Sequence, residues 1–113
     1  MEVKSVSVKF LAGQSISEIL TLNSQKIIGF RIPNDWDSAN LTILNATPEY
    51  PDYADVITET ASELEVLAVA GKYTKVSPDD FAGFDNIKLR SGISSSPVNQ
   101  TSERIIEVRV REY

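Results

Sequence analysis

The sequence contains neither cysteine nor histidine. Without cysteine, the chain cannot form a disulfide, use a thiolate nucleophile or hold zinc through sulfur, and its composition suits assembly in a reducing cytosol. Without histidine, it lacks the commonest general base and the commonest metal ligand, and it cannot build a Ser-His-Asp or Cys-His site. These two absences predict a protein that is not an enzyme and that needs no metal ion or cofactor.

Long apolar runs are also missing. No segment approaches the roughly 20 consecutive apolar residues with which a helix crosses a membrane. The opening stretch, MEVKSVSVKFLAG, lacks the apolar core of a secretory signal. We therefore expect the chain neither to enter a membrane nor to be secreted.

What remains has the composition of an ordinary globular protein. The chain has 113 residues, of which 42% are hydrophobic and 24% are charged. These fractions exclude wholesale disorder, and the length suits one domain rather than two. We expect a single domain over residues 1–113.

The net charge of −5 is unevenly distributed. Residues 1–47 are neutral overall, residues 48–85 carry −7, and residues 86–113 carry +2. The overall sign argues against nucleic acid or an anionic membrane as the main partner. Two interpretations of the asymmetry stay open: a solvated acidic surface, or an acidic patch that faces the basic C-terminal strand of a neighbouring copy.

Apolar and polar residues alternate with a period of two along much of the chain, as in strands with one buried face. Val6, Val8 and Phe10 form one apolar row. Further rows are Ile28/Phe30/Ile32, Leu64/Val66/Ala68 and Ile106/Val108/Val110. The pattern predicts an all-β antiparallel β-sandwich, jelly-roll-like, with eight or nine strands. We place these strands near residues 3–10, 15–22, 26–32, 40–46, 54–58, 63–69, 72–76, 86–90 and 104–112.

Two other segments break the strand pattern. Ser77 followed by Pro78 and two acidic residues predicts one short helical turn near 78–82. Residues 91–102, SGISSSPVNQTS, are small and polar, and they predict a long loop. Such a loop is either packed on its own domain or held by a partner.

Asp35, Trp36 and Asp37 form the first candidate site. Acidic oxygens at alternate positions suit calcium, but the turn glycine and closing glutamate of a calcium loop are missing. The alternatives are an Asp-rich turn whose tryptophan plugs one end of the sandwich, or a tryptophan that anchors an interface. The acidic pairs Asp52/Asp55 and Asp79/Asp80 are better explained as solvated loop residues than as a glycosidase pair.

Aromatic and basic residues supply further candidates. Tyr50 and Tyr53, in a loop bounded by prolines, are expected to be exposed and would suit sugar stacking. Phe81 and Phe84 are expected to attach the helical turn to the core. Lys88 and Arg90 project from one face of a strand, beside Arg109 and Arg111 if those strands are neighbours. They form either a solvated basic face or a docking patch for an acidic neighbour.

Several of these motifs, taken together, resemble a family of small phage and prophage virion proteins encoded near the major capsid gene. The resemblance rests on IPNDWDSANLT at 32–42, DFAGF at 80–84, IKLRSG at 87–92, PVNQ at 97–100 and Arg104. It covers residues 28–106. One departure lies at 45–51, where NATPEYP replaces the serine-aspartate-glycine hairpin of the relatives, so a contact made there would differ.

The resemblance implies a structural protein of a tailed-phage virion, assembled in the host bacterial cytoplasm. We expect a capsid decoration (cement) protein that binds the major capsid protein or other virion proteins and is itself a homo-oligomer. The alternatives are a tail, baseplate or head-tail connector subunit, and a carbohydrate-binding host-attachment module. The residues expected at the partner interface are Asp35, Trp36, Tyr50, Tyr53, Lys88, Arg90, Ser91, Gly92, Pro97, Asn99 and Gln100.

Overall fold

The structure, a computed structural model, describes residues 2–112. Over that range its regular secondary structure is almost entirely β-strand. It contains β1 (Val3–Phe10), β2 (Leu20–Thr21), β3 (Lys26–Arg31), β4 (Leu41–Ala46), β5 (Ala54–Asp55), β6 (Glu65–Val66), β7 (Tyr73–Lys75), the 3-10 helix η1 (Pro78–Phe81), β8 (Asn86–Ile93), β9 (Ser96–Pro97) and β10 (Arg104–Arg111). These residues thus form ten strands rather than eight or nine. The additional strand, β9, lies in the segment predicted to be a loop.

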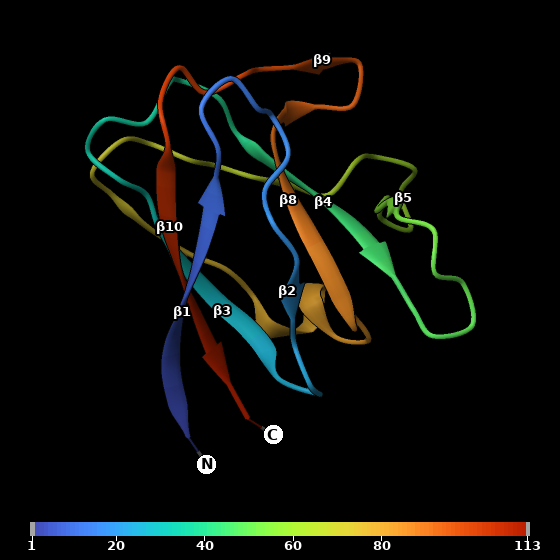
Figure 1. Ribbon diagram of the computed structural model, residues 1–113. Coiled ribbons are helices and arrows are strands. Elements are labelled where there is room, and N and C mark those ends of the chain that lie inside the picture. The colour runs from blue at the N-terminus through green and yellow to red at the C-terminus, as the bar shows by residue number, and fades with distance from the viewer. Residues whose placement is uncertain (1, 113) are drawn as a thin grey trace.

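The strands form two antiparallel sheets (Figure 1). One has the order β1-β10-β3-β7 and is called the β10 sheet here. The other has the order β2-β8-β4-β5, with β6 also on β4 and β9 on β8, and is called the β8 sheet. Because β1, β2, β3 and β4 alternate between the two sheets, the chain wraps around the sandwich as a jelly roll. The predicted fold class is therefore confirmed.

The predicted apolar rows supply half of the core. Val8 and Phe10 of β1 and Ile106, Val108 and Val110 of β10 are buried between the sheets. Their polar neighbours in the sequence point outward, as the alternation of a strand requires. The neighbouring strands β1 and β10 therefore each have one buried face and one solvent-exposed face.

The row predicted along β3 is partly wrong. Ile27, not Ile28, is fully buried together with Phe30. The register against β10 shifts between Arg109, which faces Gly29, and Val110, which faces Ile27. This β-bulge inserts one extra residue, so the alternation changes phase at Ile28.

The strand predicted at 15–22 is mostly an irregular connection. The backbone N–H of Ser17 donates to Leu89 in the β8 sheet, and the N–H of Glu18 donates to Lys9 in the β10 sheet. One segment thus bonds to both sheets, and it cannot continue as a regular strand of either. The strands predicted at 54–58 and 63–69 are likewise short, because both pair with the same edge of β4.

The predicted helical turn is confirmed as η1. Phe81 is buried and lies 5.9 Å from Phe30 and 5.8 Å from Phe84 between ring centroids. The two phenylalanines therefore attach this turn to the core, as expected. Ser77 occupies the N-cap position, but its side chain makes no capping hydrogen bond.

Candidate functional site

The eleven residues predicted at a partner interface divide into two groups. Five are buried (Trp36, Arg90, Ser91, Gly92 and Gln100), and six are exposed or half-exposed (Asp35, Tyr50, Tyr53, Lys88, Pro97 and Asn99). The buried five hold the fold together, so their expected role as surface contacts is corrected. The surface role of the other six stays a prediction.

Gln100, in the segment that follows β9, joins this segment to the loops at 13–14 and 37. Its side-chain oxygen accepts the Asp37 N–H at 2.9 Å, and its amide nitrogen donates to the Asp37 carbonyl at 3.1 Å and to the Ser91 hydroxyl at 2.8 Å. Its backbone bonds to Gly13 and Gln14. Every polar group of this fully buried residue is engaged within its own chain.

Asp37 and Arg104 continue this network toward the surface. The guanidinium of Arg104 lies 3.1 Å from an Asp35 oxygen and 3.5 Å from an Asp37 oxygen. The second Asp37 oxygen accepts the backbone N–H of Thr101. The Thr101 hydrogen bonds, with the Arg104 charge beside them, hold the pKa of Asp37 below its ordinary value. Both aspartates of the first candidate site thus face a cation of their own chain.

Trp36 lies between these two aspartates but points the other way. Its side chain is 5% exposed, and its ring meets that of Phe10 edge-on at a centroid distance of 5.3 Å. The indole N–H donates to the carbonyl of Ala39 at 2.9 Å. Of the alternatives considered, the structure supports the tryptophan that closes one end of the sandwich.

Arg90 is surrounded by acidic groups of its own chain. Its guanidinium pairs with Asp55 and, at 3.1 Å, with Glu63. These two carboxylates flank the excursion between β5 and β6, which is also closed by a bridge between Ile57 and Glu63. Arg90 therefore fastens this excursion to the β8 sheet, and it is not a docking group for an acidic neighbour.

Lys88 projects from the same face of β8, but the basic patch expected there does not extend to Arg109 and Arg111. These two arginines belong to β10, in the other sheet. The ammonium group of Lys88 lies 4.5 Å from the centroid of the Tyr53 ring, a cation–π contact. One face of Tyr53 is therefore occupied.

Gly92 and Ser91 begin the hairpin that β9 completes. Gly92 has φ of +93°, and a Cβ there would lie 2.6 Å from the Ser96 carbonyl oxygen. The Thr42 hydroxyl donates to the Gly92 carbonyl, and the Val98 N–H donates to that of Ser91. The 91–102 segment is thus packed on its own domain, one of the two alternatives considered, with Pro97 and Asn99 on its outer side.

Tyr50 is the most exposed large apolar side chain of the described residues, at 79%. Its backbone N–H and C=O both bond to Thr47, at 3.1 Å each, and the Thr47 hydroxyl accepts the same N–H at 3.2 Å. A closed turn therefore presents the ring to solvent. This turn lies in the segment between β4 and β5, which projects from the side of the sandwich (Figure 1).

Residues 2–112 form no cluster of three or more side chains suited to hold a metal ion. Nor does this part of the chain contain a helix that is long and apolar enough to span a membrane.

The chain has the fold of a prophage-derived protein. The solved structure is that of the SPBc2 prophage-derived protein YomS, with a TM-score of 0.57 and 13% sequence identity. The similarity covers 97% of this chain and 95% of that one. No family model matches the chain, and no curated protein matches it in sequence. At this identity the similarity concerns the fold, not the role of any residue.

Sequence reasoning missed the acidic partners Asp55 and Glu63 and the buried pairing of Arg104. A signal for Arg104 existed, because it shares a strand face with Ile106 and Val108, where a charge needs a partner. Arg90 offered no such signal. It alternates with apolar residues as a solvent-facing side chain does, and only the covering excursion buries it.

Replacing Gln100 with alanine should destabilise the fold by about 2–4 kcal/mol, because the Asp37 and Ser91 groups lose their partners inside a cavity. Urea unfolding would measure this change. The matched control is Gln14→Ala, since Gln14 is exposed and its contact with Gln100 uses only the backbone; we expect a change within about 0.5 kcal/mol. Equal effects of the two substitutions would refute the role of the Gln100 amide.

Asp37 should make the fold sensitive to acid. Because its folded-state pKa is lowered, its carboxylate stabilises the fold above the unfolded-state pKa of about 4, and this contribution is lost as the pH falls through the folded value. Asp37→Asn should therefore be less stable than the wild type at neutral pH, with a gap that narrows toward about pH 3. Thermal unfolding across this range tests the prediction, with the exposed Asp52→Asn as control. A gap that widens in acid would contradict it.

Proposed function

We propose that this chain is a non-catalytic structural protein of a tailed-phage virion, and that it decorates and stabilises the capsid shell. The observation that carries the proposal is the similarity to a prophage-derived protein over nearly the whole length of both chains. The sequence motifs at 32–42, 80–84 and 87–104, which resemble virion proteins, support it further. On this proposal the chain is soluble, joins the particle in the bacterial cytoplasm, and uses no cofactor.

The internal bonding of the fold suits such a role. Gln100, Arg90 and Arg104 hold the loops through contacts within the chain, so the surface is ordered before a partner arrives. A pre-ordered surface loses less conformational entropy on binding than a mobile one. Repeated across the symmetry of a shell, even a small contact per copy would give firm attachment through avidity.

Tyr50 is the best candidate anchor for the capsid contact. A large aromatic ring on a closed turn combines apolar area with low entropic cost, and tyrosine is enriched at binding hot spots. The partner we propose is the major capsid protein. Lys88 and Tyr53 lie at the base of the same projecting segment, and Asp35, Pro97 and Asn99 lie on the loops at the β9 end.

Two other functions make different predictions. A tail, baseplate or connector subunit would have the same fold and few copies per particle. A carbohydrate-binding module would need aromatic faces open to a sugar ring. Tyr50 offers such a face, but the cation–π contact with Lys88 occupies one face of Tyr53. The structure therefore favours a protein contact over a two-ring sugar platform.

The number of copies of this chain per virion distinguishes a head protein from a tail protein. Quantitative mass spectrometry of purified virions, with the major capsid protein as internal standard, should find about one copy per capsid subunit or a simple fraction of that ratio. A ratio of a few per cent would move the chain to the tail or connector. Its absence from the particle would refute the virion role altogether.

Tyr50→Ala should weaken binding of the purified chain to capsids that lack it by at least about tenfold. Its free energy of unfolding should change by no more than about 0.5 kcal/mol, because the ring is already in solvent. Co-sedimentation with capsids measures the first quantity and urea unfolding the second. Ile19→Ala, another exposed apolar residue, is the control that should bind normally. Unchanged binding of the Tyr50 variant would exclude this turn as the contact.

A further inference from the structure

The outer face of the β10 sheet is basic. Because Val108 and Val110 are buried, Arg109 and Arg111 project from the opposite side of β10. The register places Arg109 beside Gly29, which in turn faces Lys75 of β7. On the same face, Lys26 of β3 is paired with Arg111, and Arg31 of β3 is paired with Glu107, an acidic residue of β10.

Tyr73 lies across the middle of this basic face. A side chain at position 29 would collide with the phenol of Tyr73, so the glycine leaves room for the ring to lie over β3. The tyrosine remains 49% exposed, although Gly29 beneath it is buried. An aromatic ring on a sheet face that also carries arginines is typical of a protein-binding surface.

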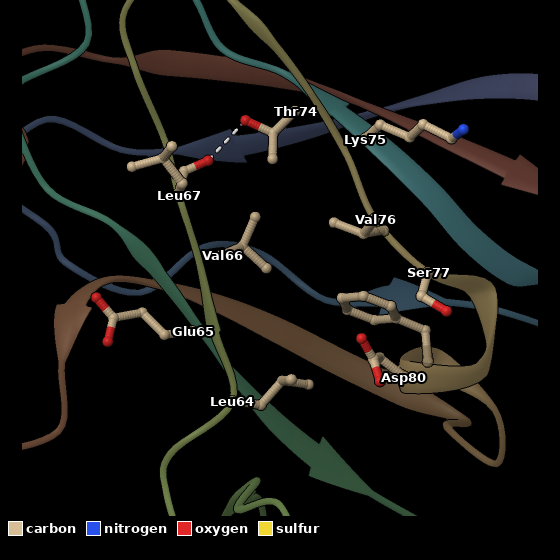
Figure 2. A pocket seen from close by; sticks show the side chains of 10 residues that line it. Leu64, Glu65, Val66, Leu67, Thr74, Lys75, Val76, Ser77 and Asp80 are labelled. Atoms are coloured by element: carbon tan, nitrogen blue, oxygen red, sulfur yellow. Dashed lines mark hydrogen bonds between the residues drawn. The ribbon is translucent and has the colours of Figure 1, made fainter.

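A groove with the opposite charge lies at the open side of the sandwich, between β6 and β7. It has a volume of about 250 Å³, and Figure 2 shows Val66 and Val76 facing each other across it. A second hollow of about 370 Å³ shares Leu64 and Asp80 with it, so the two are neighbours. We call the pair the acidic groove.

The lining of the acidic groove is apolar at its base and acidic at its rim. Glu65 and Asp80 border the first hollow together with Lys75 of the basic face, and Glu59 borders the second, so three carboxylates face one ammonium group. The three carboxylates are exposed. Leu67 and Ile57, which are 61% and 65% exposed, line its two ends. Exposed apolar side chains with a polar rim are typical of a surface that meets another protein.

The geometry points to self-association in which the basic face of one copy docks in the acidic groove of a second copy. The two surfaces are complementary in charge, and each also carries apolar or aromatic area. Both belong to the same chain, so every copy supplies both halves of the contact. A chain of net charge −5 is a poor partner for nucleic acid, which makes a protein partner the better match for the basic face.

Salt and charge reversal test this inference on the purified chain, independently of any virion. Sedimentation velocity over a concentration series up to about 1 mM should show association at about 0.05 M salt that weakens at least tenfold at about 0.5 M. Arg31→Glu with Arg109→Glu reverses the basic face, and Glu59→Lys with Asp80→Lys reverses the groove. Each double variant alone should be monomeric.

Mixing the two double variants gives the decisive result. The reversed face of one then meets the reversed groove of the other, so the mixture should associate at least as well as the wild type. Lys4→Glu with Lys88→Glu makes the same change in net charge away from the basic face and should leave self-association intact. Circular dichroism confirms that each variant is folded.

Three outcomes would overturn the inference. One is a wild-type chain that stays monomeric at low salt. Another is self-association that survives both reversals. The third is a monomeric wild type that retains a single-stranded oligonucleotide through Arg31 and Arg109, which would assign the basic face to nucleic acid. None of these results bears on the copy number in virions, so the proposed function is tested independently of this inference.

Discussion

The buried amide of Gln100 is the contact on which one whole end of the sandwich depends. An amide offers donors and an acceptor on one rigid group, and few other side chains can bind a backbone N–H, a carbonyl and a hydroxyl together. The amide joins the segments at 37 and 91, and the Gln100 backbone bonds to the segment at 13–14, so residues far apart in the sequence meet at one position. Without the amide, the Asp37 backbone and the Ser91 hydroxyl would lose their partners inside the protein.

Two buried arginines also join distant segments, but through ion pairs. Arg90 and Arg104 each pair with two carboxylates of the same chain, so four of the acidic residues are used in holding loops. Breaking one side of such a pair would leave a charge uncompensated inside the protein. The cations of the basic face and the carboxylates of the acidic groove take no part in these four ion pairs. The proposed contacts thus use surfaces that the framework holds in place.

Much of the fold follows from local pattern. Alternation identifies β1, β4 and β10, and it assigns the inward side correctly for Val8, Val108 and their neighbours. It fails at β3, because a bulge is a property of two paired strands and leaves no mark in one of them. It also overestimates the strand at 15–22, where one segment bonds to both sheets. For the candidate site, exposure is predicted well for Tyr50 and poorly for Trp36 and Gln100, whose environment is made by distant loops.

The sequence by itself determined an all-β chain, the side of β1, β6 and β10 that faces inward, and the lack of any histidine or cysteine chemistry. These are consequences of residue type and of a period of two, which act within a few residues. Only the tertiary structure decided which polar residues are internal. Lys88 and Arg90 occupy equivalent positions on β8, yet only Arg90 is buried, because the Asp55–Glu63 excursion folds over it. That contact joins segments about 30 residues apart, and sheet packing rather than local pattern brings them together.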